Sequence, residues 1–139
     1  MEYRQFGDSF VVRLNRGEEI ITELTALCKK ENIKLASVQG IGAADLATIG
    51  LYNVNEKLYH KTQLKGAMEI TSLLGNITTM NGETYLHLHI NLCDENMNIK
   101  GGHLNECRIS ATGEIIVTKI NGNVDRIKDN ETGLNIFKF

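Results

Sequence analysis

Three histidines are the residues of this sequence best suited to chemistry. His87 and His89 form a His-x-His pair, and His103 follows two glycines. A neutral imidazole holds a divalent metal at about 2.0–2.1 Å, and three of them with a fourth position open to water are typical of a catalytic zinc site. Such an ion acidifies its bound water or polarises a carbonyl group. We therefore predict a divalent-metal site at these histidines, with zinc the expected ion, although iron, nickel and copper accept the same ligands.

The segment that carries the His-x-His pair alternates between apolar and polar residues, which is typical of a half-buried strand. The face expected to lie on the core consists of Leu86, Leu88, Ile90 and Leu92, and the opposite face of Tyr85, His87, His89, Asn91 and Cys93. Side chains two residues apart in a strand point the same way and lie about 6–7 Å apart. The two imidazoles could therefore reach one ion.

His103 has to return to the same face from outside this strand. Gly101 and Gly102 come directly before it, and glycine lets the backbone bend tightly and approach a neighbouring strand closely. We expect residues 94–100 to form the loop that brings His103 back to His87 and His89.

The sequence does not assign a single role to the other polar residues near the histidines. Residues that could orient a ligand histidine are Glu69, Asn91, Asn105 and Glu106. Cys93 is either a soft fourth ligand or a packed thiol, and His60 is expected to be an ordinary histidine. No nucleophile or general base can be identified, so catalytic residues stay unassigned. A simpler alternative makes all three site histidines polar residues on a hydrated sheet face, because a His-x-His pair alone is a weak signal.

The surrounding pattern predicts one helix followed by many strands. The helix is expected over about 17–31, and strands over 9–14, 35–41, 46–52, 57–61, 69–78, 84–93, 107–119 and, weakly, 134–137. Asn81-Gly82 is a strong hairpin signal, and Asn121-Gly122 is a second turn of the same kind. We predict an α+β fold with a largely antiparallel sheet and a flanking helix or helices, in a single domain over 1–139.

Two segments allow more than one interpretation. Ile70, Leu73 and Ile77 also fit a helical stripe, but Gly75 and the following hairpin turn favour a strand. Gly40-Ile41-Gly42 resembles part of a dinucleotide-binding loop, yet it lacks the third glycine and a following helix. We expect a glycine-assisted bend between strands there.

Composition excludes several classes of protein. The chain has 139 residues, 42 % hydrophobic residues and a net charge of −2, so a globular domain is expected and no overall positive field would attract DNA. Its three scattered cysteines suggest neither a disulfide framework nor a zinc ribbon. Because there is no apolar signal region and no membrane-length apolar run, we expect a cytoplasmic location and no membrane partner.

The ordered set of motifs resembles the plants-and-prokaryotes-conserved (PPC) domain family, in its stand-alone prokaryotic type. The matching segments are Leu51-Tyr52, residues 69–77, His87-Leu88-His89, Gly101-Gly102-His103-Leu104, Glu114-Ile115 and Arg126. The resemblance implies an antiparallel sheet with flanking helices, a homotrimer, and a histidine motif at His87, His89 and His103. It predicts a metal-binding homotrimer without assigned chemistry, with room for a small-molecule ligand at the metal.

Two further functions stay open. Plant members accompany AT-hook motifs in nuclear DNA-binding proteins, which suggests a DNA-associated transcriptional regulator, but this chain has no AT-hook. Acetolactate decarboxylases are similar in fold type and hold zinc through a comparable histidine order, which suggests a metal-dependent lyase or hydrolase on a small carbonyl compound. The chain is much shorter than those enzymes, and no residues of this sequence can be matched to their catalytic carboxylates and arginine. Cupins also use His-x-His, but their second, proline-bearing motif is absent.

Overall fold

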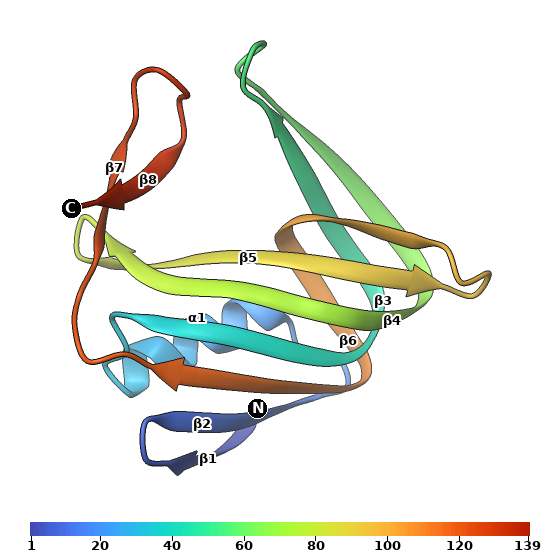
Figure 1. Cartoon of the computed structure of the whole chain (residues 1–139). Helices are drawn as coiled ribbons and strands as arrows, with labels where there is room; N and C mark the ends of the chain where they lie inside the picture. The colour runs from blue at the N-terminus through green and yellow to red at the C-terminus, as the bar shows by residue number, and fades with distance from the viewer.

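The computed structural model describes residues 1–139 and contains one helix among eight strands (Figure 1). The elements are β1 (Glu2–Phe6), β2 (Ser9–Asn15), α1 (Ile20–Lys30), β3 (Ala36–Asn53), β4 (Leu58–Met80), β5 (Glu83–Asp94), β6 (Ile99–Lys119), β7 (Asp125–Lys128) and β8 (Asn135–Lys138). All strand pairings are antiparallel, so the predicted antiparallel sheet with a flanking helix is confirmed. The helix does not have the length and apolar character needed to cross a bilayer.

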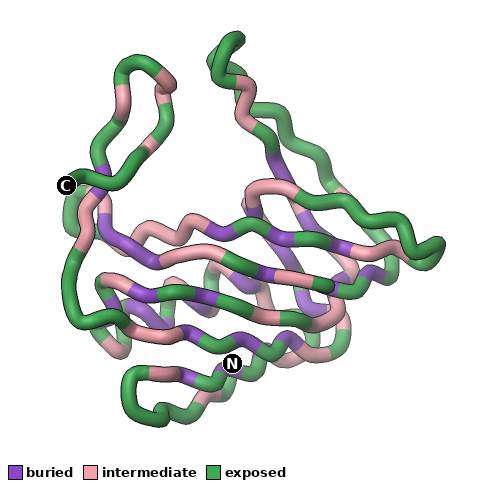
Figure 2. Tube along the Cα trace, viewed as in Figure 1, coloured by how far each residue is buried: buried purple, intermediate pink, exposed green.

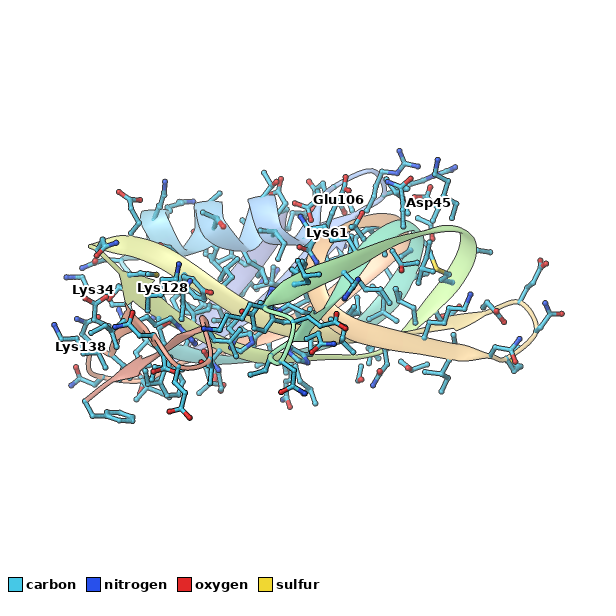
Figure 3. All side chains as sticks on the ribbon, turned by 90° about the horizontal axis from the view of Figure 1, so that it is seen from above. Lys34, Asp45, Lys61, Glu106, Lys128 and Lys138 are labelled. Atoms are coloured by element: carbon cyan, nitrogen blue, oxygen red, sulfur yellow. The ribbon has the colours of Figure 1, made fainter.

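The main sheet is partly closed on itself. Its strand order is β1-β2-β6-β3-β4-β5, and β5 also pairs with β6. Strands β3, β4, β5 and β6 therefore form a closed ring, while β7 and β8 make a separate hairpin. Figure 3 shows α1 on one side of the sheet and the β7–β8 hairpin, which carries Lys128 and Lys138, on the other.

Strands β3, β4 and β6 are longer than the sequence pattern predicts, and β6 begins at Ile99, where a strand was expected only from 107 onward. The segments expected at 35–41 and 46–52 form the single strand β3, and those at 57–61 and 69–78 form β4. Register shifts between Gly40 and Gly42 and between Ala44 and Leu46 bend β3 without ending it. A β-bulge bends and twists a strand while its pairing continues. The breaks between predicted strands were therefore wrong here, and the glycine pair at 40–42 marks an irregularity within one strand. Strands β1 and β7 were not predicted.

A bulge also explains the helix-like stripe in β4. Ile70, Leu73 and Ile77 are buried, and the register against β5 shifts between Ile70 and Ser72. The extra residue puts Ile70 and Leu73 on one face although they are three residues apart. The prediction of a strand over this segment is confirmed.

The hydrophobic core lies between α1 and the sheet. Glu19 precedes the helix and accepts hydrogen bonds from the backbone N–H groups of Ile21 (3.0 Å) and Thr22 (2.8 Å), which caps its N-terminus. The helix buries Ile20, Leu24, Leu27 and Cys28 at helical spacing. Along the strands buried and exposed residues largely alternate (Figure 2), as expected for a sheet with one covered face.

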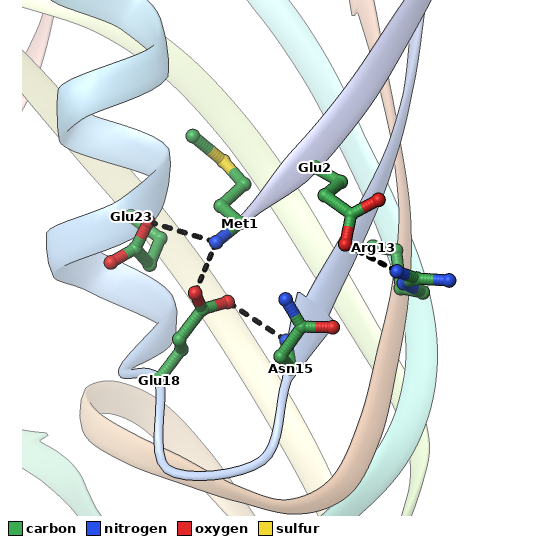
Figure 4. A network of polar contacts seen from close by, with 6 residues as sticks. All are labelled: Met1, Glu2, Arg13, Asn15, Glu18 and Glu23. Carbon is green, nitrogen blue, oxygen red and sulfur yellow. Dashed lines mark hydrogen bonds and ion pairs between the residues drawn. The ribbon is translucent and has the colours of Figure 1, made fainter.

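Polar contacts attach the first strand to the start of the helix (Figure 4). The amino group of Met1 contacts the Glu18 carboxylate and lies 3.8 Å from Glu23. The Met1 amino group is the main cause of the lowered pKa of Glu18. Glu18 also accepts a hydrogen bond of 2.8 Å from the backbone N–H of Asn15, at the end of β2. These contacts hold β1, β2 and α1 in one unit.

The two predicted Asn-Gly turns have different outcomes. Asn81 and Gly82 join β4 to β5 with φ angles of 54° and 83°. A two-residue hairpin turn of this kind needs positive φ at both positions, so this prediction is confirmed. Asn121-Gly122 lies between β6 and β7, which do not pair with each other. The second hairpin-type turn was therefore wrong.

Candidate metal centre

The structure brings the three predicted histidines together. His87 and His89 lie on β5, and His103 lies on β6 directly opposite His89 in the antiparallel register. Ring centroids are 5.3 Å apart for His87–His89, 5.3 Å for His87–His103 and 5.6 Å for His89–His103. One nitrogen from each ring lies within 4.8 Å of the other two. The three imidazoles thus form a nearly equilateral triangle on one face of the sheet.

The connection predicted over 94–100 does return His103 to the pair, but it is a shorter turn than expected, between Asp94 and Ile99, and strand pairing completes the placement. A tight turn after Asp94 leads from β5 to β6, and β6 pairs with β5 from Ile99 to His103. At His103 the strand also begins to pair with β3, because His103 lies opposite Gly50. The third histidine therefore lies where the ring of strands closes.

The double glycine works differently from the prediction. Gly101 and Gly102 are within β6, so the expected tight bend is wrong. The expected close approach is confirmed, because a Cβ on Gly102 would lie 2.7 Å from the carbonyl oxygen of Gly50 on β3. A Cβ on Gly101 would lie 2.0 Å from Oδ1 of Asn91. Without side chains at these positions, β6 fits between its two neighbours beside the histidines.

The environment favours the neutral form of two of the three imidazoles. His87 and His103 are partly buried, and His89 is exposed. Burial lowers the pKa of His87 to about 4, with further contributions from the charges of His103, Arg126 and His89. Burial and the neighbouring His89 also lower the pKa of His103. A neutral ring keeps a nitrogen lone pair that can bind a metal ion, so at neutral pH these two rings have the form that a metal ligand needs.

The donor set fits a divalent ion with one position left open. Tetrahedral coordination at about 2.1 Å separates two nitrogen ligands by about 3.4 Å, so a modest rotation of these rings completes the set. The cluster contains no carboxylate. Three neutral ligands would leave the charge of a bound dication uncompensated, which favours an anionic or oxygen-bearing ligand at the open position.

The predicted orienting residues do not contact the imidazole nitrogens. Asn105 donates from Nδ2 to the backbone oxygen of His103 (3.2 Å), and Asn91 donates to Ser72 (3.0 Å). Glu106 accepts a hydrogen bond of 3.2 Å from Thr48.

Three other residues considered from the sequence lie outside the histidine cluster. Glu69 is paired with Cys93 in the strand register. Sγ of Cys93 lies 3.9 Å from the sulfur of Met97, and Cys93 is not part of the cluster. His60 is exposed near the start of β4, where its Nε2 lies 3.6 Å from the Glu56 carboxylate.

Sequence reasoning gave Arg126 no role, although it is buried beside the site. Its guanidinium donates to Asn76 Oδ1 (2.8 Å), and Asn76 lies directly opposite His87 in the β4–β5 register. It also donates to Thr78 (2.8 Å) and to the backbone oxygen of Asn135 (2.7 Å). The guanidinium lies 4.6 Å from the ring centroid of Tyr85 and 4.6 Å from that of Phe137. Arg126 therefore fastens the C-terminal hairpin to the strands beside His87, and only the family pattern had marked it.

A hollow on the surface contains none of the three histidines, but one of its lining residues, Leu74, lies directly opposite His89 in the β4–β5 register. The hollow has a volume of about 920 Å³ and lies over β1, β2, β6, β3 and β4. Its lining includes Phe6, Val11, Ile41, Leu74 and Ile116, all of them exposed. The apolar hollow and the histidine cluster therefore adjoin each other at Leu74 and His89.

Comparison with known proteins gives one family and a consistent set of structures. The sequence model described as the Plants and Prokaryotes Conserved (PCC) domain matches residues 1–121. A crystal structure from Bacteroides thetaiotaomicron, named a "putative dna binding protein", is similar with 34% identity and a TM-score of 0.97, over 99% of this chain and 96% of that one. No curated protein sequence matches the chain.

Two archaeal structures are also similar over nearly the whole chain. A plant- and prokaryote-conserved (PPC) protein from Pyrococcus horikoshii shares 30% identity with a TM-score of 0.86, covering 99% of this chain and 95% of that one. A protein from Archaeoglobus fulgidus described as metal-containing shares 28% identity with a TM-score of 0.88, over 99% and 97%.

The likeness to acetolactate decarboxylase is one of fold alone. The enzyme from Bacillus subtilis shares 13% identity with a TM-score of 0.56, over 84% of this chain and 54% of the enzyme. A likeness at this level gives no ground for transferring the decarboxylase reaction.

Proposed function

The chain belongs to the Plants and Prokaryotes Conserved domain family, and on this premise we propose that it binds one divalent metal ion through His87, His89 and His103. The observation that carries the proposal is the convergence of these three rings, with one nitrogen of each within 4.8 Å of the others. The description of a 28% identical relative as metal-containing supports it. Zinc is the proposed ion because three imidazoles and an open position are its usual catalytic ligand set.

Each part of the site has a physical role in this proposal. His87 and His103 are held neutral by partial burial, so the metal competes with few protons at pH 7. Pairing of β5 with β6 fixes the relative positions of His89 and His103. A bound ion would supply Lewis-acid chemistry at its open position. No catalytic residue is assigned, and the site is proposed to hold a small ligand there.

Metal analysis of protein purified without a polyhistidine tag tests the proposal. We expect about one equivalent of zinc per chain and a higher melting temperature when zinc is added. Replacing His89 by Ala should weaken zinc binding at least about 100-fold, because loss of residues that merely support a ligand already weakens metal sites about 10–100-fold. His60→Ala is the matched control and should bind zinc normally, because His60 lies outside the cluster. Substoichiometric metal together with an unchanged melting temperature would contradict the proposal.

We also propose the homotrimer that the family resemblance implies. The apolar hollow supports self-association, because Phe6, Ile41 and Leu74 line it and are 62%, 58% and 57% exposed. Monomeric proteins rarely expose a contiguous apolar patch larger than a few hundred Å². Light scattering should give three times the mass of the chain, and Leu74→Glu should lower that mass. The exposed Ile127 on β7 offers a matched control, Ile127→Glu, that should leave the mass unchanged.

DNA association is the second candidate, favoured by the names of two similar structures. The proteins from Bacteroides thetaiotaomicron and Ralstonia eutropha are both named "putative" DNA-binding proteins. The net charge of −2 argues against this function, because phosphate contacts supply most non-specific affinity. We expect no change in the fluorescence anisotropy of a labelled duplex at low salt. Binding that weakens steeply as salt is added would favour the DNA function instead.

A further inference from the structure

Tyr59 places a hydroxyl group beside the histidine cluster. A Cβ built on Gly50 would lie 2.1 Å from Oη of Tyr59, so this hydroxyl fills the space that a side chain at Gly50 would take. Gly50 lies directly opposite His103 in the β3–β6 register, and residues so paired present their side chains on one face, about 4.5–5.5 Å apart. The Tyr59 ring meets the His103 ring edge-on, with centroids 6.0 Å apart. The hydroxyl therefore lies on the histidine face, next to His103.

Asn105 fixes the direction in which this hydroxyl can act. Nδ2 of Asn105 lies 3.2 Å from the backbone oxygen of His103 and 2.7 Å from Oη of Tyr59. A backbone oxygen can only accept, so the amide must present its N–H₂ group to both oxygens. Oη of Tyr59 is then the acceptor from Asn105, and it donates its own proton to no group of the protein. A free O–H donor is held beside the metal ligands.

The charges around this hydroxyl favour an anionic partner. The histidine cluster contains no carboxylate. Lys61, labelled in Figure 3, lies two residues from Tyr59 on β4 and places its Nζ 5.7 Å from the Tyr59 ring centroid. The guanidinium of Arg126 donates to Asn76 (2.8 Å), which lies directly opposite His87 in the β4–β5 register. A dication in this setting would attract a negatively charged ligand.

We propose that Tyr59 is a positioning residue that donates a hydrogen bond to a small carboxylate bound at the open position of the metal. The inference rests on the proposed metal site and adds the chemical class of its ligand. One carboxylate oxygen would take the open position, and the other would accept the proton of Oη. Gly50 is required by this arrangement, because any side chain there would displace the hydroxyl.

A titration of the cobalt-loaded protein with acetate tests the inference. Cobalt(II) accepts the same imidazole ligands, and its visible spectrum reports changes at the open position. Tyr59→Phe keeps the ring and should leave cobalt affinity unchanged while weakening acetate binding about tenfold or more, as loss of a hydrogen bond to a charged group does. The matched control is Tyr52→Phe, whose hydroxyl donates to the backbone oxygen of Thr132. It should bind acetate like the unsubstituted protein.

A second variant displaces the hydroxyl without removing it. Gly50→Ala puts a methyl group where Oη lies, and the flexible end of the tyrosine can move aside. It should lose acetate affinity like Tyr59→Phe and keep its cobalt.

The outcomes separate the two proposals. Failure of the unsubstituted protein to bind cobalt would overturn the metal site itself. Normal cobalt binding with no acetate-dependent change would overturn only the role of Tyr59. So would an acetate affinity in Tyr59→Phe and Gly50→Ala equal to that of the unsubstituted protein.

Discussion

Two regions of this sheet are held together by different forces. Where α1 covers the sheet, Leu24 and Leu27 are fully buried among apolar side chains. At the histidine end, the imidazoles are partly exposed, and polar contacts from Arg126 and Asn105 connect the surrounding strands. The first region gains its stability from many interchangeable apolar contacts. The second depends on the register of a few strands, because that register alone sets which side chains meet.

This difference separates stability from site geometry. A core of 25 buried residues distributes its contribution to the free energy of unfolding over many side chains. The histidine triangle has no such redundancy, because β5 carries two of its members and β6 the third. Damage to the core should therefore lower stability without changing the site, whereas a displaced strand near His87 should affect both.

The largest effect is expected from Leu24→Ala in the helix-covered region. Leu24 is 0% exposed, and removing a buried leucine side chain usually lowers the free energy of unfolding by about 2–5 kcal/mol. Urea unfolding measures this loss, while zinc stoichiometry of the folded protein should stay the same. Leu51→Ala is the control, because Leu51 is 65% exposed and should change stability by less than about 0.5 kcal/mol. Loss of zinc in the folded Leu24 variant would show that the two regions are not separable.

An intermediate effect on both regions is expected from Gly75→Ala. A Cβ on Gly75 would lie 2.0 Å from the backbone oxygen of His87 and 2.9 Å from Cα of Leu88. Backbone atoms cannot move aside as a flexible side chain can, so β5 should shift away from β4. We expect a loss of about 1–3 kcal/mol in the free energy of unfolding and weaker zinc binding, measured by urea unfolding and calorimetry. Gly122→Ala should change neither quantity, because its nearest neighbour, Leu35, lies at 3.6 Å.

The smallest effect is an acid sensitivity of the metal-free protein. The pKa of His87 is about 4 in the fold, against about 6.5 for an unfolded histidine, so the unfolded chain binds more protons between these values. The contribution of His87 to stability should be constant above pH 6.5 and fall as the pH is lowered toward 4. Because the ring is only partly buried, we expect a loss of only about 1 kcal/mol.

Urea unfolding at several pH values measures this sensitivity. His87→Gln should flatten the profile between pH 6.5 and 4. An equally steep profile in that variant would assign the sensitivity to other groups.

Local patterns in the sequence predicted the parts that depend on neighbouring residues. The helix followed from apolar residues at helical spacing, and the hairpin at Asn81-Gly82 from residues that accept positive φ. The face shared by His87 and His89 followed from the alternation of β5. Each of these features is set within about ten residues of the chain, where spacing and backbone preference decide the outcome.

Features that depend on distant partners could not be predicted in the same way. The glycine-containing segment that suggested a break in β3 forms bulges instead. That β3 continues through them is seen only in its pairing with β4 and β6. Gly50 lies inside a strand, and its type alone did not indicate that the Tyr59 side chain packs against it. A glycine allows another group to approach closely but does not show which group does so. The hydroxyl of Tyr59 and the guanidinium of Arg126 lie beside the histidines because strands distant in the sequence pack together.

The sequence alone determined which side chains can bind a metal and that two of them share a strand face, because both properties belong to residue type and to the two-residue period of a strand. Only the tertiary structure decided that His103 lies opposite His89, because cross-strand register is fixed by the turn between β5 and β6 and by closure of the strand ring at Gly50. Tertiary structure likewise decided what surrounds the triangle, since Tyr59, Asn105 and Arg126 come from three different strands.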